Sequence, residues 1–236
     1  MSKTLNVFAA LAVLAVPNLA AAAPVTFFGE DLETNGVALT STPNATAARN
    51  QFFSNLTGVG TETFQGFAVG ATPPIQVNFG TAGMATLTGT GSVQSGRSST
   101  DQFPISGTKY YNTDGTFRLN FSTPISAFGF YGTDIGDINA SLTLTLTGSN
   151  GTTTQAVPDV LGTKANGSAL YYGFYDTAAT YTAISFAGAG ADIFGFDDFS
   201  IGTRAQVVPT AVPEPAGWAI LGMGLLGMGM IRRVRT

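Results

Sequence analysis

The sequence predicts an all-β protein, a β-sandwich with a jelly-roll-like arrangement and one short helix near residues 43–56. Three observations predict it. Short runs rich in β-branched and aromatic residues recur from residue 24 to about residue 202, separated by clusters of Gly, Asn, Asp, Ser and Thr. Several of these runs alternate apolar and polar residues with period two, which is typical of strands with one buried and one hydrated face. Helical periodicity appears once, so two packed sheets are favoured over a mixed fold.

Ten segments are expected to form strands. The clearest alternation lies in 141–147, where Leu142, Leu144 and Leu146 share one face and threonines share the other. The expected strands span residues 25–28, 64–69, 75–79, 85–88, 116–121, 125–131, 141–147, 170–175, 182–186 and 194–201. The expected helix follows Thr42, which can cap it, with Pro43 at the first helical position and Gly58 suited to its end.

Glycine beside phenylalanine recurs in four of these segments, as at Gly129 and Gly173. Glycine inside a strand marks a bulge or a close backbone approach, and the neighbouring aromatic rings fill the core, so we interpret the pattern as packing. Aromatic side chains exposed on a concave sheet would instead stack against sugars. Burial is the commoner fate of the residues that could do so, which are Tyr110, Tyr111, Tyr171, Tyr172 and Tyr175.

The composition excludes most familiar enzyme chemistry. The 236 residues include no Cys and no His, and 10% are charged, against about 25% in an average protein. Disulfides, thiolate nucleophiles, Ser-His-Asp triads and His-based zinc sites are therefore excluded. A catalytic site would have to use carboxylates alone, as glycosidases do, and no pair in the sequence is singled out for that role. We expect a protein that is not an enzyme.

The charge of the central part of the chain is acidic. Setting aside the four basic residues at the two ends leaves six basic residues against 14 acidic ones, a net charge of −8. Because binding to phosphates needs clustered Lys and Arg, nucleic acid is not an expected partner.

Residues 1–22 have the form of a secretory signal peptide: Lys3, an apolar stretch over 5–16, and small residues ending in Ala22, after which cleavage is expected. A permanent anchor fits less well, because the apolar stretch is shorter than the roughly 20 residues that span a bilayer.

The C-terminus has three parts in order. They are the tripeptide Pro213, Glu214 and Pro215, the uncharged stretch 216–231, and the basic cluster Arg232, Arg233 and Arg235. Such a stretch is expected to form a single transmembrane helix whose basic end stays cytoplasmic, although it is shorter than usual and rich in glycine.

This order resembles the PEP-CTERM sorting signal of exported proteins of Gram-negative bacteria. The resemblance implies a tail that anchors the protein transiently in the inner membrane until an exosortase-type enzyme removes it on the way to the cell surface. It also implies an association with exopolysaccharide and the biofilm matrix. The expected division is a signal peptide over 1–22, a β-sandwich domain over 23–205, and a linker with the sorting signal over 206–236.

The acidic residues gather in three groups without Lys or Arg beside them, an arrangement that suits Ca²⁺. One pattern, an aromatic residue before Asp197 and Asp198, resembles the last strand of calcium-bearing jelly-roll carbohydrate-binding modules, although Phe199 departs from it. That resemblance implies a structural calcium site shared with an acidic residue after the first strand. The predicted ligands are Glu30, Asp31, Asp197 and Asp198, and a second acidic loop contains Asp134 and Asp137. Asp is also an ordinary turn residue, and this alternative stays open.

These observations predict an exported protein of the cell surface or extracellular matrix that binds or organises exopolysaccharide, with a structural Ca²⁺ as its one expected cofactor. A self-associating structural matrix protein is the alternative, and a carboxylate-dependent glycan-active enzyme is a third. Exposed tyrosines in a groove would favour binding, an unprotected edge strand would favour assembly, and two carboxylates at glycosidase separation would favour catalysis.

Overall fold

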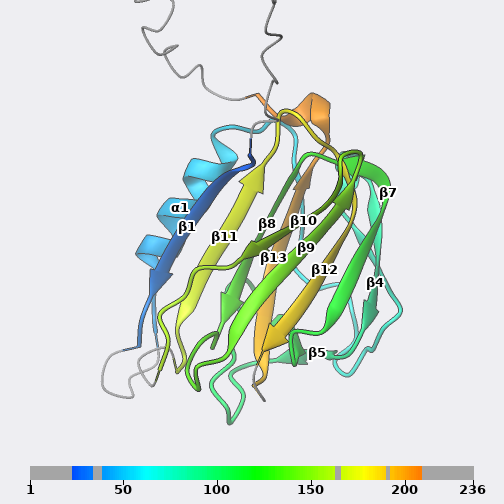
Figure 1. The fold of residues 1–236 in the computed structure, drawn as a ribbon. Helices are drawn as coiled ribbons and strands as arrows, with labels where there is room; N and C mark the ends of the chain where they lie inside the picture. Colours follow the sequence, from blue (N-terminus) through cyan, green and yellow to red (C-terminus); the bar gives the residue numbers. More distant parts are fainter. Residues whose placement is uncertain (1–22, 34–38, 163–165, 190–191, 209–236) are drawn as a thin grey trace, which may run out of the picture.

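The computed structural model describes residues 23–33, 39–162, 166–189 and 192–208 as two antiparallel β-sheets packed face to face, with one helix outside them (Figure 1). The predicted all-β sandwich with one helix is confirmed. No helix among the described residues is long and apolar enough to cross a membrane. The predicted signal peptide and the predicted transmembrane helix lie outside the described residues.

One sheet has seven strands, in the order β1 (Val25–Asp31), β11 (Ala169–Tyr175), β8 (Ala127–Thr133), β13 (Phe194–Gly202), β6 (Lys109–Thr113) and β5 (Ser92–Ser95), with β2 (Gly60–Glu62) paired to β13. The other has six, in the order β10 (Gly151–Ala156), β9 (Ser141–Gly148), β12 (Tyr181–Ala189), β7 (Phe117–Ile125), β4 (Met84–Gly89) and β3 (Ile75–Asn78). Two short 3-10 helices, Gly80–Ala82 and Arg204–Gln206, follow β3 and β13.

Nine of the ten expected strands fall on observed strands. The prediction for 64–69 is wrong: this segment is a loop, and Phe64 has a positive φ of 58°. Its buried ring stacks on Tyr111, with ring centroids 5.8 Å apart, so the apolar residue fills the core from a loop.

The main core lies between the sheets and consists largely of phenylalanine rings. Phe199 is fully buried and its ring contacts Phe64, Phe128 and Phe186, with centroids 5.4, 5.7 and 6.2 Å away. The leucines of β9 are fully buried too, as the alternation in 141–147 predicted.

Helix α1 (Pro43–Phe53) covers the outer face of β1 and β11 and encloses a second, smaller core. Gly129 and Gly173 are paired partners on β8 and β11 beneath it. A Cβ at Gly129 would lie 2.2 Å from Tyr171 Oη, and one at Gly173 would lie 3.1 Å from Phe52 Cδ2. The predicted packing role of these glycines is thereby explained, because they leave room for the helix to pack on the sheet.

The register places the first and last described strands so that the chain enters and leaves at one end of the sandwich. The start of β1 and the end of β13 lie in one row across four strands, formed by Val25, Tyr175, Ala127 and Gly202. We call this the terminal end, at the top of Figure 1. The opposite row is Asp31, Ala169, Thr133 and Gly195, and we call it the loop end. Pairing continues to Val208, whose N–H donates to Asn55 O at 2.8 Å, a little beyond the predicted boundary at 205.

Candidate metal centre

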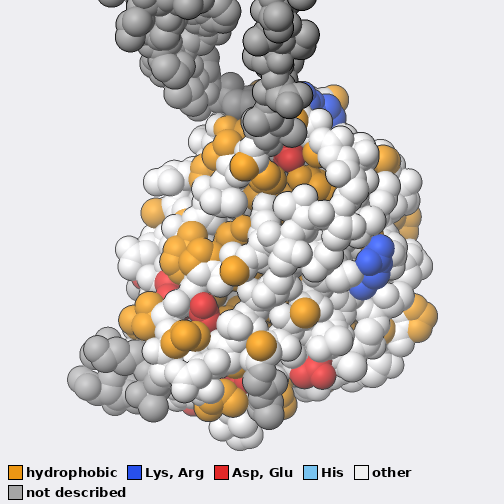
Figure 2. Space-filling view, in the orientation of Figure 1, with side chains coloured by type: hydrophobic (Ala, Val, Ile, Leu, Met, Phe, Trp, Pro, Cys, Tyr) orange, Lys and Arg blue, Asp and Glu red, His pale blue; other side chains and the backbone are white. Residues whose placement is uncertain are grey.

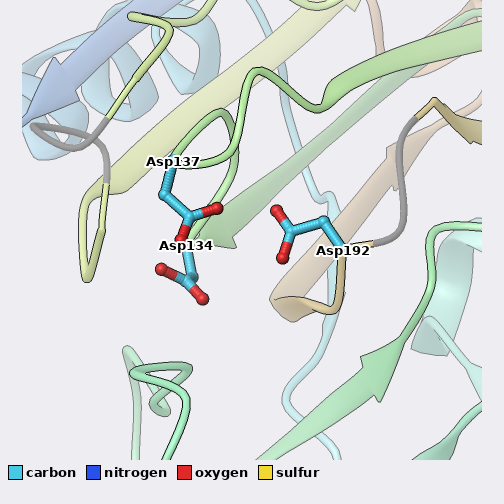
Figure 3. A group of neighbouring side chains, drawn as sticks. All are labelled: Asp134, Asp137 and Asp192. Carbon is cyan, nitrogen blue, oxygen red and sulfur yellow. The ribbon is translucent and has the colours of Figure 1, made fainter.

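Three carboxylates meet at the loop end. Asp134 and Asp137 lie in the loop that follows β8, and Asp192 lies just before β13. Because β8 and β13 are antiparallel neighbours, the end of one lies beside the start of the other. One oxygen from each carboxylate lies within 4.8 Å of the others (Figure 3). In the part of the chain that the structure describes, no other group of three such side chains is equally close. We call these residues the acidic triad.

Asp134 is held rigidly and is 2% exposed. Its Oδ1 accepts the Gly167 N–H at 2.8 Å, and its Oδ2 accepts a hydrogen bond from Gln102 Nε2. The fully buried Gln102 amide also donates to Ile193 O at 2.8 Å. Gln102 therefore ties the loop that carries Asp134 to the segment that carries Asp192.

The other two carboxylates have oxygens without partners. Asp137 Oδ1 and Asp192 Oδ2 are buried and accept no hydrogen bond. The ion pairs of the described residues both belong to Arg97, with Glu33 and Asp101, so none neutralises the acidic triad. A buried carboxylate oxygen without a donor destabilises the fold unless a proton or a cation compensates its charge.

Burial, together with the neighbouring Asp137 charge, raises the pKa of Asp134 to about 6. Burial, together with the neighbouring Asp137 carboxylate, raises the pKa of Asp192 to about 7. At neutral pH the acidic triad is therefore only partly ionised, and a cation would compete with protons for it. Carboxylate oxygens grouped in this way suit Ca²⁺, which takes six to eight oxygen ligands.

The four residues predicted as calcium ligands are not gathered into such a group, and their calcium role stays a prediction. Asp31 accepts the N–H groups of Asn44 and Ala45, at 3.1 and 2.9 Å, in the first turn of α1. The prediction that Thr42 caps the helix is wrong, since its side chain makes no capping hydrogen bond. A carboxylate from the neighbouring strand satisfies the free N–H groups and complements the helix dipole instead. The helix also ends at Phe53, before the predicted end at residue 56.

We expect Asp31→Ala to lower the free energy of unfolding by about 1–2 kcal/mol, as the loss of a helix cap does. Urea denaturation with calcium and with chelator measures it, and the loss should be equal in both. Thr42→Ala is the matched control and should cost less. A larger loss for Thr42→Ala would contradict the assignment of the cap to Asp31.

Asp197 and Asp198 join β13 to a loop. Asp197 Oδ2 accepts the N–H groups of Ile105 and Ser106, each at 2.9 Å, and Asp198 Oδ1 accepts the Ser106 hydroxyl at 2.5 Å. Burial, followed by the Asp198 charge, raises the pKa of Asp197 to about 7. Asp198 has φ 50° where the register of β13 against β8 shifts. The pair therefore anchors a loop at a bulge of β13, and its calcium role stays a prediction.

Glu30 faces another carboxylate. Its Oε2 accepts the Val160 N–H at 3.0 Å, while its Oε1 is buried without a partner. Burial, together with the nearby charges of Asp159 and Asp31, raises the pKa of Glu30 to about 7.

The tyrosines considered for sugar stacking are all buried, which is the fate that the sequence favoured, so the stacking alternative is excluded. Their exposed fractions are 1, 0, 0, 2 and 6% for Tyr110, Tyr111, Tyr171, Tyr172 and Tyr175. The cause is that both faces of the seven-stranded sheet are covered. Tyr171, for example, faces α1, with its ring 5.9 Å from that of Phe52, while Tyr172 on the opposite face belongs to the core between the sheets.

Sequence reasoning did not place Asp192 beside Asp134 and Asp137, and it missed Gln102. The spacing of Asp134 and Asp137 after a strand was a usable indication. The addition of Asp192 depends on the pairing of β8 with β13, which no local pattern contains.

Comparison with known proteins identifies the C-terminal motif and little else. The PEP-CTERM protein-sorting motif matches residues 211–235, which confirms the resemblance noted for the tail and implies an exported protein with a membrane-anchoring region. No curated protein matches the chain.

Three solved structures illustrate the structural similarities. The K2 cleaved adhesin domain of Lys-gingipain shares 14% identity, with 61% of this chain and 98% of that chain covered and a TM-score of 0.38. The C-terminal family 22 carbohydrate-binding module of Clostridium thermocellum Xyn10B shares 12%, with 63% and 95% covered and a TM-score of 0.37. The CBM22-1 xylan-binding domain of Paenibacillus barcinonensis Xyn10C shares 14%, with 64% and 94% covered and a TM-score of 0.33. TM-scores this low do not establish a shared fold, and the sandwich assignment rests on the pairing of the strands.

Proposed function

We propose that this carrier of a PEP-CTERM sorting motif is a non-catalytic protein of the cell surface or extracellular matrix that binds and organises exopolysaccharide. The observation that carries the proposal is the outer face of the six-stranded sheet, which we call the polar face. With the tyrosines buried, hydrogen bonding across this face replaces aromatic stacking as the means of holding a sugar chain.

The polar face consists mainly of hydroxyl and amide side chains. Exposed or half-buried members on β3, β4, β7 and β9 include Gln76, Thr86, Thr88, Asn120, Ser122, Thr143, Thr145 and Thr147. Such groups both donate and accept hydrogen bonds, as sugar hydroxyls do. Figure 2 shows the surface over β9, β10 and β12 as mostly white, which marks uncharged polar side chains and backbone.

Two shallow hollows lie along β4 and β7 on this face. One, of about 270 Å³, is lined by residues that include Gln76, Thr86 and Asn120. The other, of about 260 Å³, includes Thr88 and Ser185. Both are smaller than the roughly 300–1,000 Å³ of an enclosed small-molecule site. Their size and openness suit a polymer that lies across the surface.

The carboxylates support a role without catalysis. Asp137 and Asp192 each have a carboxylate oxygen buried from solvent, whereas the two carboxyl groups of a glycosidase must face the sugar that lies between them. We propose that the acidic triad holds a structural Ca²⁺ that fixes the loop end. Three carboxylates would supply part of the six to eight oxygen ligands.

The proposed route to the surface uses the motif at the C-terminus. An exosortase-type enzyme would recognise the tripeptide Pro213, Glu214 and Pro215 while the following apolar stretch holds the protein in the inner membrane. The basic cluster Arg232, Arg233 and Arg235 would keep the end of the chain in the cytoplasm. These residues lie outside those that the structure describes, and the motif match is the support for this step.

One feature favours a second function, that of a self-associating matrix protein. Strand β10 forms an edge of the six-stranded sheet, is largely exposed, and contains neither a charged residue nor proline. Charges and prolines are the common protection of edge strands against pairing with another chain. The edge strand β1, by contrast, carries Glu30 and Asp31 and is covered by α1.

The two functions separate in one experiment on residues 23–208, which contain both core clusters and every described strand pair. We expect retention on immobilised polysaccharide, measured against a panel of neutral and acidic polymers, and a weaker retention for Thr86→Ala with Asn120→Ala. Thr153→Lys on β10 is the matched control and should leave retention unchanged. The second function would be supported instead if the protein self-associates, if Thr153→Lys abolishes that self-association, and if no polymer retains the protein.

A further inference from the structure

We propose that the polar face prefers acidic polysaccharide, and that Arg118 binds the carboxylate groups of the polymer. This inference rests on the proposed function and names the class of ligand that the same face takes. It follows from how charge is distributed between the two sheets and from how Arg118 is held.

The six strands of the six-stranded sheet contain one charged residue, Arg118, and no acidic one. The strands of the other sheet contain one basic residue, Lys109, and five acidic ones, which are Glu30, Asp31, Glu62, Asp197 and Asp198. A polyanion is therefore repelled by one side of the sandwich and attracted by the other, which orients it on the polar face.

Arg118 lies near the middle of that face. A row of paired residues crosses five strands there, consisting of Thr154, Thr145, Ser185, Arg118 and Thr88. Neighbours in such a row are about 4.8 Å apart. Four hydroxyl groups thus flank one guanidinium group across the width of the sheet.

The guanidinium group is oriented without being neutralised. Its Nε donates to Asn120 Oδ1 and its NH1 donates to Ser185 Oγ, each at 2.8 Å. Both acceptors are neutral, and the ion pairs of the described residues do not include Arg118. The planar guanidinium fork suits a carboxylate, with which it forms two parallel charge-assisted hydrogen bonds. Its side chain is already ordered by neutral neighbours, which lowers the entropic cost of that contact.

The two hollows extend the contact along the strands. Asn120 lines one and Arg118 lines the other. The lining segments 120–122 and 116–118 are centred on Phe121 and Phe117, about 13 Å apart along an extended chain. A polymer along β7 would occupy both hollows and contact Arg118 in the second.

The test compares two polymers with the same backbone. Polygalacturonate carries a carboxylate on each sugar, and its full methyl ester carries none. We expect residues 23–208 to bind the acid form at least tenfold more tightly than the ester at low salt, with the difference shrinking in 0.5 M salt as charges are screened. Arg118→Gln should remove that difference, while Arg118→Lys should keep part of it.

Arg49→Gln is the matched control, because Arg49 lies over the Phe53 ring of α1, outside the polar face. Arg49→Gln should leave the affinity for both polymers unchanged. The thermal midpoint of Arg118→Gln should confirm that this variant is folded. Equal binding of both polymers, unchanged by Arg118→Gln, would overturn this inference and leave the proposed function standing. Equal loss of both polymers in Arg118→Gln would show a general hydrogen-bond donor and also overturn it. Absence of binding to either polymer, and to every other polysaccharide, would overturn both.

Discussion

Calcium should raise the thermal midpoint of residues 23–208 by roughly 5–10 °C at pH 8, and Asp192→Asn should abolish the rise. A ligand that binds only the folded state at a hundred times its dissociation constant adds about 2.7 kcal/mol to stability. Each kcal/mol shifts the midpoint of a domain of this size by about 2–4 °C. The physical reason is the pair of buried, unpartnered oxygens, Asp137 Oδ1 and Asp192 Oδ2, whose charge a divalent cation would compensate.

The effect should depend on pH in a defined direction. The folded protein holds protons on Asp134 and Asp192 up to about pH 6 and 7, whereas an unfolded chain releases them near pH 4. Between these values the folded state binds more protons, so its stability falls as the pH rises through the window. In chelator the midpoint should therefore be lower at pH 8 than at pH 5. Calcium binds the ionised carboxylates, so it should raise the thermal midpoint most at pH 8.

The variants separate the acidic triad from other carboxylates. Glu30 and Asp197, whose pKa is also raised to about 7, lower stability over the same window. Only the part that Asp192→Asn removes belongs to the acidic triad. Asp137→Asn should act in the same way, and both variants should be more stable than the parent in chelator, because they remove like-charge repulsion. Asp197→Asn is the control and should retain the calcium response. A response lost in Asp197→Asn and kept in Asp192→Asn would place the ion at the site first predicted from the sequence.

Phe199→Ala should lower the free energy of unfolding by about 3–5 kcal/mol, which is the usual cost of emptying a fully buried phenylalanine site. Phe199 has no exposed surface, and its ring contacts those of Phe64 and Phe196, with centroids 5.4 and 6.2 Å away. Since a domain has about 5–15 kcal/mol in total, this single change removes a large part of its stability.

Urea unfolding followed by tyrosine fluorescence measures this loss. Phe28→Ala is the matched control, because the Phe28 side chain is 40% exposed and should cost less than half as much. Similar losses for the two variants would contradict the burial of Phe199 between the two sheets.

Period-two alternation in the sequence was sufficient to predict much of the fold. The strand at 141–147 and the burial of its leucines follow directly from Leu-Thr repetition, because the two faces of that strand meet core and solvent. The same rule cannot find β10, whose sequence Gly-Thr-Thr-Thr-Gln-Ala is exposed along nearly its whole length. It misassigned 64–69 because a loop that packs inward has the same apolar content as a strand.

The site was less predictable, since its contacts join distant parts of the chain. Asp31 caps a helix that begins twelve residues later, and Thr42, the local choice, does not. The acidic triad depends on β8 and β13 being neighbours, and the burial of Tyr171 and Tyr175 depends on α1 covering the sheet. Each of these contacts depends on how distant segments pack together, which residue types and spacing do not determine.

Both ends of the described chain lie at the terminal end, which gives the sandwich a direction. Strands β1, β11, β8 and β13 run between Val25 or Gly202 at one end and Asp31 or Gly195 at the other, a span of about 20 Å. A tether attached after Val208 would hold the sandwich by the terminal end. The acidic triad would then lie at the end farthest from the tether, toward the ions of the surrounding medium. The polar face would form one side of the sandwich between the two ends.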